Sequence, residues 1–294
     1  MTRIGIAGSG RLAAFVTQRL AVKHFVRVFD TALGDSLRCE GVKQVDSAAA
    51  MVQDVDAVIL CTDSNSARNA LLRDPDGLKA ICTGERVVID MSQADPDETR
   101  AIATDLSGFG ITLVDAPLYT ENTERVPEAS VILFGGSKAT LESVRSLLEA
   151  ICSKIIYCGE AGNGHATRLV VSAIAACNRF ITYECASMGA KSGLSMSDMA
   201  TVLNRSSGFN SASAQILPAL ATNGRTADVS VGSVARDLAK ASALGMRYGT
   251  PMLIATMVHS MVDAAVNRLG EASCIDRLAE IWEADAGLPL FPGK

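Results

Sequence analysis

The stretch GEAGNGHATRLVVSAIAACNRFITYECASMGAKSG, residues 159–193, predicts one long helix near the middle of the chain. From His165 to Ser192 it contains no proline and a single glycine. A helix over residues 165–192 would be roughly 40 Å long at about 1.5 Å per residue. Apolar residues recur in it at steps of three and four, the pattern of a buried helical face. They are Leu169, Val170, Ala173, Ile174, Cys177, Phe180 and Ile181. We expect this helix to join two domains.

The sequence pattern changes at the long helix. Apolar runs typical of buried parallel strands precede it; they are Ile4–Ala7, Phe25–Phe29, Val55–Cys61, Arg86–Ser92, Ile111–Asp115, Ser130–Phe134 and Lys154–Tyr157. Only helical periodicity follows it, over Met196–Leu203, Ala212–Leu220, Val234–Met246, Met252–Leu269 and Ile275–Ala284. We therefore expect an α/β fold, with a Rossmann-type doubly wound sheet in residues 1–161 and an all-helical domain for substrate binding or dimerisation in residues 162–294. Some helices are apolar on more than one face, which favours a homodimer or a higher homo-oligomer.

Composition and charge argue against several classes of partner. The net charge is −5, from 27 Lys and Arg against 32 Asp and Glu, without a basic run that would bind nucleic acid. The eight cysteines show neither a CxxC pair nor a metal-ligand spacing, so we expect reduced thiols and no metal. No uninterrupted apolar run reaches the roughly 20 residues of a membrane span, and no signal peptide is visible. We expect a cytoplasmic protein without a membrane partner.

A glycine-rich turn follows the first predicted strand. Gly8-Ser9-Gly10-Arg11-Leu12-Ala13 has the pattern GxGxxA, and residues 12–22 have the periodicity of an amphipathic helix. Strand, glycine turn and helix in this order are the context that a dinucleotide fingerprint requires. The first glycine permits the tight turn, the second lets the backbone approach a pyrophosphate, and the helix N-terminus offers N–H groups to the anion. We expect four of these residues to bind the cofactor: Gly8, Gly10, Arg11 and Leu12.

Asp30 indicates which dinucleotide is bound. It follows the second predicted strand, about 20 residues beyond the fingerprint. A carboxylate there accepts hydrogen bonds from both ribose hydroxyls and repels a 2′-phosphate, so NAD is favoured over NADP. The structural alternative is an N-cap for the next helix, because Asp is also a preferred cap.

Small polar residues end two further predicted strands. Cys61, Thr62 and Asp63 follow one of them, and Ser92 follows the other. Ligands of open α/β sheets bind at the carboxyl ends of the strands. We therefore expect all four residues to contact the cofactor, and Ser92 to contact the substrate as well.

Taken together, these motifs resemble the β-hydroxyacid dehydrogenase family, which includes 3-hydroxyisobutyrate and 6-phosphogluconate dehydrogenases. The resemblance covers nearly the whole chain and depends on the order and spacing of its motifs. They are the fingerprint, Asp90-Met91-Ser92 with Pro96, Asp115-Ala116-Pro117, Gly135-Gly136, Gly159 to Gly164 before the long helix, and Arg236-Asp237-Leu238. The resemblance implies a Rossmann domain, a long interdomain helix, a helical second domain and usually a dimer. It also implies hydride exchange between nicotinamide and the carbon that bears the β-hydroxyl of a small acid.

The long helix departs from the family pattern. Members usually have a lysine there, as GxGxxxK, that serves as general acid/base, and an asparagine four residues later. Here these positions hold Arg168 and Ser172, a helical i, i+4 pair. Lysine can exchange a proton near neutrality when burial lowers its pKa, whereas arginine effectively cannot. Arg168 can instead hold a carboxylate or stabilise an alkoxide. We predict Arg168 as catalytic and Ser172 as substrate-binding, with a surface arginine as the alternative.

The substrate loop departs as well. Members have Asp-Ala-Pro-Val-Ser-Gly-Gly, and this chain has Asp115-Ala116-Pro117-Leu118-Tyr119-Thr120-Glu121. The two glycines, whose N–H groups reach a substrate carboxylate, are absent. Tyr119 is a candidate to supply the proton that arginine cannot, or it only fills space. We expect Tyr119 and Thr120 to bind substrate.

Two further positions carry charge or a titratable group. Arg236 replaces the lysine of the family's late Lys-Asp pair and keeps its positive charge for the cofactor. His165, one turn before Arg168, is another candidate acid, although a histidine in the first turn of a helix is more often incidental.

Three functions fit these residues. The favoured one is an NAD-dependent oxidoreductase acting on the CH–OH group of a small β-hydroxy or oxo acid, with altered proton chemistry. The second is a reductase of a different electrophile, such as an imine. The third is a protein that binds NAD without turnover. A substrate panel and Tyr119→Phe separate the first two, and the third predicts NADH binding without hydride transfer.

Overall fold

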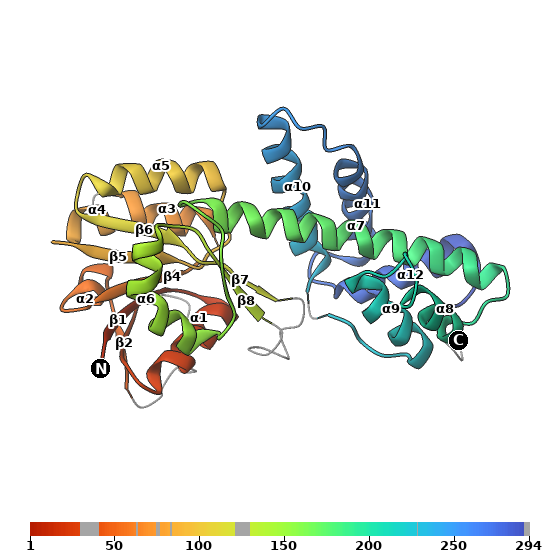
Figure 1. The fold of residues 1–294 in the computed structure, drawn as a ribbon, viewed down its shortest axis with the longest axis horizontal. Coiled ribbons are helices and arrows are strands. Elements are labelled where there is room, and N and C mark those ends of the chain that lie inside the picture. The colour runs from red at the N-terminus through yellow and green to blue at the C-terminus, as the bar shows by residue number, and fades with distance from the viewer. Residues whose placement is uncertain are drawn as a thin grey trace. The chain divides into compact units, whose positions relative to one another are not determined.

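The computed structural model describes residues 1–29, 41–62, 64–74, 77–82, 84–120, 130–227 and 229–290. The chain divides into two compact units, an α/β unit that ends at Arg168 and a helical unit that begins at Leu169 (Figure 1). The two compact units therefore divide inside the long helix, whereas the expected domains divide just before it, at 161/162, and those bounds stay a prediction. The reason is local, because the main chain at Gly162 and His165 is hydrogen-bonded to Asp115 of the α/β unit.

A six-stranded parallel sheet forms the centre of the α/β unit, in the order β3-β2-β1-β4-β5-β6. Its strands are β1 (Arg3–Gly8), β2 (Phe25–Phe29), β3 (Val42–Val45), β4 (Ala57–Cys61), β5 (Arg86–Asp90) and β6 (Ile111–Asp115). Strand order reverses between β1 and β4, which makes their carboxyl ends the switch point where such sheets bind ligands. The strands were predicted except β3, whose sequence VKQV lies at the edge of the sheet and lacks a continuous apolar run.

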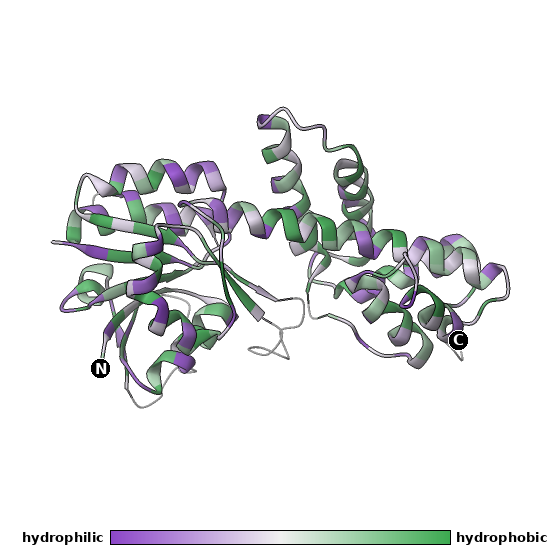
Figure 2. Ribbon diagram, viewed as in Figure 1, coloured by the Kyte–Doolittle hydropathy of each residue, from purple (hydrophilic) through white to green (hydrophobic). Residues whose placement is uncertain are grey.

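Helices cover both faces of this sheet. They are α1 (Gly10–Ala21), α2 (Ala48–Val52), α3 (Asn65–Arg73), α4 (Leu78–Ile81), α5 (Pro96–Ser107) and α6 (Lys138–Ile151). Side chains alternate across each strand, so Ile59 packs in the cluster with α1 and α6, while Val58 and Leu60 pack in the cluster with α2 to α5. The central strands are accordingly hydrophobic in Figure 2. This is the doubly wound architecture that the sequence predicted.

A second, three-stranded sheet follows β6. It consists of β7 (Leu118–Thr120), β8 (Ser130–Phe134) and β9 (Ile155–Tyr157) in that order. The last two strands were expected in the main sheet, but β8 pairs with β7 on one side and with β9 on the other, and an isolated bridge joins Asp115 to Gly135. Buried strands of different sheets have the same apolar pattern, so the sequence could not separate them.

The helical unit contains the rest of α7 (Asn163–Lys191) and the helices that follow it. These are α8 (Met196–Leu203), α9 (Ser211–Thr222), α10 (Val231–Arg247), α11 (Leu253–Leu269), the 3₁₀ helix η3 (Ile275–Arg277) and α12 (Leu278–Ala286). The predicted all-helical domain is therefore confirmed. One detail differs, because the last predicted helix is divided into η3 and α12.

Only some of the apolar residues that were expected to form the buried face of α7 are buried. Leu169, Ala173 and Phe180 are buried in the core of the helical unit. Val170, Ile174 and Ile181 are instead 56%, 57% and 49% exposed, so their predicted burial was wrong. Each lies one position after a buried residue and is turned by about 100° around the helix axis.

The hydropathy of α7 has a structural explanation. Among the helices of the described ranges, it alone has the length and composition of a membrane span. Its buried face forms part of the hydrophobic core of the helical unit. Core packing therefore accounts for the apolar residues on that face, whereas Val170, Ile174 and Ile181 lie outside the core.

Candidate active site

The turn after β1 has the geometry that a dinucleotide requires. A Cβ atom on Gly8 would lie 2.2 Å from the carbonyl oxygen of Cys61 on β4, so only glycine fits there. Gly10 has a φ angle of +78°, in the left-handed region. Ser9, the N-cap of α1, makes no capping hydrogen bond through its side chain, whereas the N-cap side chains of α2, α3, α5 and α6 do. The N-terminus of α1 thus suits a pyrophosphate, and these residues fit NAD.

We predict that Gly8→Ala lowers both the melting temperature and the affinity for NADH, the latter about tenfold or more, because β1 and β4 must separate to admit the Cβ atom. Thermal unfolding and fluorescence titration with NADH measure the two effects. Gly108→Ala is the control, since a Cβ atom there meets one carbonyl oxygen at 3.5 Å. Wild-type affinity in Gly8→Ala would exclude the predicted close approach.

Two predicted residues meet at the carboxyl ends of β4 and β5. The Thr62 N–H donates to Ser92 Oγ at 3.0 Å, and the two hydroxyl oxygens are 2.9 Å apart. Both residues are buried, as is Cys61 at the end of β4. Of the other predicted cofactor residues, Arg11 is exposed and Leu12 half-buried in the first turn of α1. Asp30 and Asp63 lie outside the described residues.

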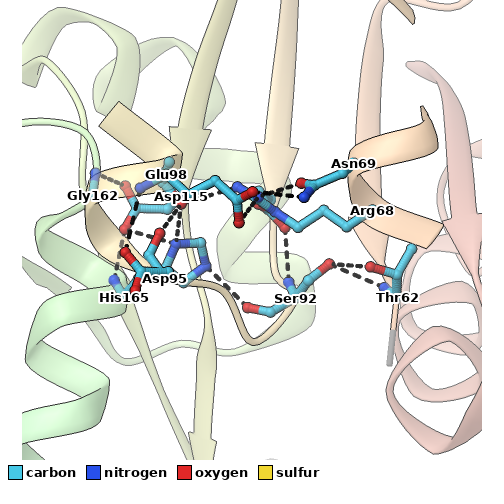
Figure 3. Close-up of polar contacts among 11 residues, drawn as sticks. Thr62, Arg68, Asn69, Ser92, Asp95, Glu98, Asp115, Gly162 and His165 are labelled. Carbon is cyan, nitrogen blue, oxygen red and sulfur yellow. Dashed lines mark hydrogen bonds and ion pairs between the residues drawn. The ribbon is translucent and has the colours of Figure 1, made fainter. Parts of the chain in front are cut away.

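A buried ion pair that the sequence analysis missed lies next to Ser92. Arg68 Nε donates to Asp90 Oδ2 at 2.5 Å, and both side chains are fully buried. The other Asp90 oxygen accepts the Ser92 N–H at 3.0 Å, and Arg68 Nη2 donates to Thr99 Oγ1 at 2.9 Å. Glu98 and Asn69 extend these contacts (Figure 3). The ion pair therefore supports the end of β5 from inside the unit.

His165 and Asp115 attach the start of α7 to this network (Figure 3). Asp115 accepts the N–H groups of Gly162 at 2.6 Å and His165 at 2.7 Å, a favourable place for a carboxylate at a helix N-terminus. The imidazole of His165 contacts Thr99 through Nδ1 at 3.0 Å and the Ser92 carbonyl through Nε2 at 2.9 Å. The ring is fully buried and both of its nitrogens contact groups of the protein, which argues against His165 as an acid for the substrate.

Burial and neighbouring charges shift the pKa values of these groups. Burial lowers the pKa of His165 below its ordinary value, although Asp115 and Asp90 act against it. Burial raises the pKa of Asp115, and His165 and the two N–H donors only partly offset this. Burial would also raise the pKa of Asp90, but Arg68 and His165 outweigh it and the pKa is lowered. The charges that these shifts favour are a neutral His165 and an ionised Asp90.

Arg168 lies on α7 one turn after His165. It is 5% exposed, which argues against a plain surface arginine. Its positive charge contributes to the lowered pKa of His165. Tyr119 and Thr120 are half-buried on β7, opposite Val131 and Ser130 of β8. Arg168 is thus positioned by α7, and Tyr119 and Thr120 are positioned by the three-stranded sheet.

The remaining predicted residues belong to the helical unit. Ser172 is half-buried on α7. Arg236 on α10 forms an ion pair with Glu271, and the two side chains are 59% and 65% exposed. The acidic partner of Arg236 was not predicted.

One signal for the missed network was present in the sequence. Asp90 and Asp115 end neighbouring strands and are partners in the register of β5 and β6. Two buried carboxylates at one sheet edge require positive or N–H partners, which the structure supplies through Arg68 and the start of α7. No local pattern marks Arg68 itself, because it lies in a polar stretch of α3.

Comparison with protein families defines the class of this protein. Residues 3–159 match the family described as the NAD binding domain of 6-phosphogluconate dehydrogenase. Residues 162–280 match the family described as NAD-binding of NADP-dependent 3-hydroxyisobutyrate dehydrogenase. The chain belongs to the β-hydroxyacid dehydrogenase family, and it is an NAD-dependent oxidoreductase that acts on CH–OH groups.

Individual relatives agree with this assignment. The chain is 28% identical over 213 residues to the NAD-dependent L-serine dehydrogenase of Pseudomonas aeruginosa, covering 71% of this chain and 72% of that protein. It is 27% identical over 266 residues to the 3-hydroxyisobutyrate dehydrogenase of the same organism, covering 86% and 89%. The structure of 3-hydroxyisobutyrate dehydrogenase from Mycobacterium tuberculosis with L-serine has a TM-score of 0.84 at 22% identity, covering 96% and 99%, and it supports the fold.

Proposed function

We propose that this protein exchanges hydride between NAD and a small β-hydroxy acid, with Arg168 in place of the family's usual lysine. The observation that carries the proposal is the position of Arg168, buried on a helix whose first turn is bonded to Asp115. A guanidinium on such a rigid element can hold a carboxylate through two parallel hydrogen bonds. Arginine remains charged throughout the accessible pH range, so it supplies charge and orientation but no proton.

The cofactor half of the site is assigned to the α/β unit. Bound NAD would accept or supply the hydride. Gly8, Gly10 and the N-terminus of α1 would hold its pyrophosphate. Thr62 and Ser92 follow β4 and β5 at the carboxyl edge of the sheet, where ligands of this fold bind. Asp30 would favour NAD over NADP through the ribose.

The proton half of the reaction is assigned to Tyr119. Oxidation of an alcohol releases its hydroxyl proton, which a neighbouring group must accept, and reduction returns it. Tyr119 is held at mid-strand in β7 by its pairing with Val131. Its phenol can exchange a proton, whereas Arg168 stabilises the developing alkoxide or holds the substrate carboxylate.

The substrate proposed is a 3-hydroxy carboxylic acid with a primary alcohol. The relatives named for L-serine and 3-hydroxyisobutyrate act on compounds of this type, which carry a CH₂OH group next to the carbon that bears the carboxylate. Arg168, together with Ser172 one turn later on α7, would bind such a carboxylate.

Tyr119→Phe tests the assignment of function and of the proton donor together. We expect NAD⁺ reduction by wild type with L-serine or 3-hydroxyisobutyrate, and little with the 2-hydroxy acid lactate. Loss of the phenol should lower kcat about a hundredfold and leave NADH affinity unchanged, as measured by fluorescence titration. Tyr157→Phe, on the exposed side of β9, is the matched control. Turnover of a cyclic imine alone would favour the alternative reductase, and NADH binding without any turnover would contradict an enzyme.

A further inference from the structure

Four residues of the α/β unit form, together with the main chain of Ser92, a closed ring of hydrogen bonds (Figure 3). The Ser92 N–H donates to Asp90 Oδ1 at 3.0 Å, and Arg68 Nε donates to Asp90 Oδ2 at 2.5 Å. Arg68 Nη2 donates to Thr99 Oγ1 at 2.9 Å, and Thr99 Oγ1 lies 3.0 Å from His165 Nδ1. His165 Nε2 lies 2.9 Å from the Ser92 carbonyl oxygen and completes the ring. Both peptide groups of Ser92 are therefore fixed from one side.

The donors and acceptors of this ring determine the form of His165. A carbonyl oxygen only accepts, so Nε2 must carry the proton and donate to Ser92. The Thr99 hydroxyl accepts from Arg68, and its own hydrogen can reach either His165 Nδ1 or the Asp95 carbonyl oxygen at 3.0 Å. That carbonyl already accepts the Thr99 N–H, whereas an unprotonated Nδ1 needs a donor. The neutral Nε2–H tautomer satisfies both ring nitrogens.

The ring also connects Ser92 to the helix that carries Arg168. The main-chain N–H of His165 is bonded to Asp115, and its side chain is bonded to Thr99 and Ser92. Gly164 lets this turn approach β8 closely, because a Cβ atom at position 164 would lie 2.3 Å from the Leu133 carbonyl oxygen. The first turn of α7 is thus packed against β8 and bonded to both β6 and the turn after β5.

We propose that His165 and Arg68 are positioning residues that hold the Ser92 turn in its ligand-binding form, and that His165 does so as the neutral Nε2–H tautomer. The inference depends on the proposed function in one respect, the assignment of Ser92 to the cofactor and substrate. With its main chain fixed by the ring, Ser92 directs its hydroxyl to Thr62 at the carboxyl ends of β5 and β4. Neither Arg68 nor His165 needs to touch the ligand.

The charged groups around His165 are consistent with this form. Asp90 and Asp115 would favour its protonation, while Arg68 and Arg168 oppose it, and burial opposes it most strongly. Protonation would place a hydrogen on Nδ1, which faces the Thr99 hydroxyl at 3.0 Å and, farther away, Asp115 Oδ2 at 3.6 Å; at 3.0 Å the Thr99 hydroxyl would be the nearer acceptor. That hydroxyl would then turn its own hydrogen away from His165.

Nitrogen-15 NMR of the full chain tests the tautomer without any assumption about function. The chain has three histidines, so His24→Gln and His259→Gln assign the His165 signals. We expect a neutral imidazole with the proton on Nε2 at neutral pH, in line with the pKa of His165 that burial lowers. A protonated ring at neutral pH, or a proton on Nδ1, would overturn the inference.

His165→Leu and His165→Gln test the positioning role. Glutamine offers one acceptor and one donor, so it can replace both ring bonds, whereas leucine replaces neither. We expect NADH to bind about tenfold more weakly to His165→Leu and within about threefold of wild type to His165→Gln. With an acid that the wild-type protein oxidises, His165→Leu should raise the KM for NAD by a larger factor than it lowers kcat.

The outcomes separate positioning from simple stability. A purely structural His165 would lower the melting temperature of His165→Leu but leave the NADH affinity of the folded protein unchanged, and that result would overturn the inference. Equal weakening in His165→Gln would also overturn it. Because NADH titration needs no turnover, a failure of every substrate would count against the proposed function and not against the positioning role. If His165→Leu does not fold, His165→Gln and the tautomer of wild type still decide the matter.

Discussion

Arg168→Met is expected to lower kcat/KM for a 3-hydroxy acid about a thousandfold, while NADH affinity changes less than about threefold. Methionine keeps the length and apolar body of the side chain on α7 but removes the charge. A charge-assisted pair between guanidinium and carboxylate is among the strongest polar contacts in proteins, and losing one partner costs about 3–5 kcal/mol. Steady-state kinetics with NAD⁺ and a 3-hydroxy acid measure the loss.

Two further variants make the result specific to Arg168. Arg145→Met removes an exposed arginine from α6, where it pairs with Glu142, and should have wild-type kinetics. Arg168→Lys restores a positive charge but not the fork of donors, so we expect only partial recovery. Full activity in Arg168→Met, with the circular dichroism of wild type, would remove Arg168 from the site.

Asp90→Asn is expected to destabilise the protein by about 3–5 kcal/mol, because Arg68, a fully buried cation, would lose its fully buried carboxylate partner and keep the more distant Glu98 at 3.7 Å. Urea denaturation followed by circular dichroism measures the change. The exposed ion pair between Arg3 and Asp56 offers the comparison, and Asp56→Asn should cost less than about 1 kcal/mol.

The double variant Arg68→Met with Asp90→Asn identifies the cause. Asparagine can still accept the Ser92 N–H, so the double variant removes both charges and keeps that bond. We expect it to recover most of the stability lost in Asp90→Asn, since an apolar replacement of a buried pair is often close to neutral. If the double variant instead lost as much stability as Asp90→Asn and Arg68→Met lose together, the contributions of Arg68 and Asp90 would be independent of each other.

The pH dependence of stability provides an independent test of whether His165 is neutral in the folded protein. The pKa of His165 is lowered in the folded protein by burial, so the unfolded chain binds this proton more readily. The stability from a neutral His165 is therefore present above the ordinary histidine pKa of about 6.5 and is lost as the pH falls below it. His165→Gln should remove that part of the loss on acidification.

The sequence predicted the features that follow from local periodicity and turn chemistry. Strand alternation and apolar runs located the main sheet, and the GxGxxA turn located the cofactor edge, because a close approach to Cys61 permits only glycine at position 8. The 29-residue α7 was predicted within two residues at its N-terminal end. These signals are carried by residues that are neighbours in the sequence.

The features that the sequence did not reveal depend on contacts between distant residues. Arg68 and Asp90 are 22 positions apart, and His165 meets Ser92 across 73. In a polar helical stretch a buried arginine has the same local pattern as a surface one, so Arg68 passed unnoticed. His165 was considered as a possible acid, and neither its complete burial nor its contacts with Thr99 and Ser92 have a local sequence signal.

Deuterium transfer is the most direct test of the central claim that this protein moves hydride from the β-carbon of a small acid to NAD. Wild type is incubated with NAD⁺ and a 3-hydroxy acid, such as L-serine or 3-hydroxyisobutyrate, that carries deuterium on the CH₂OH carbon. Mass spectrometry of the reduced cofactor should show one deuterium, and Arg168→Met should transfer far less. A cofactor that binds but acquires no deuterium from any 3-hydroxy acid would contradict the claim.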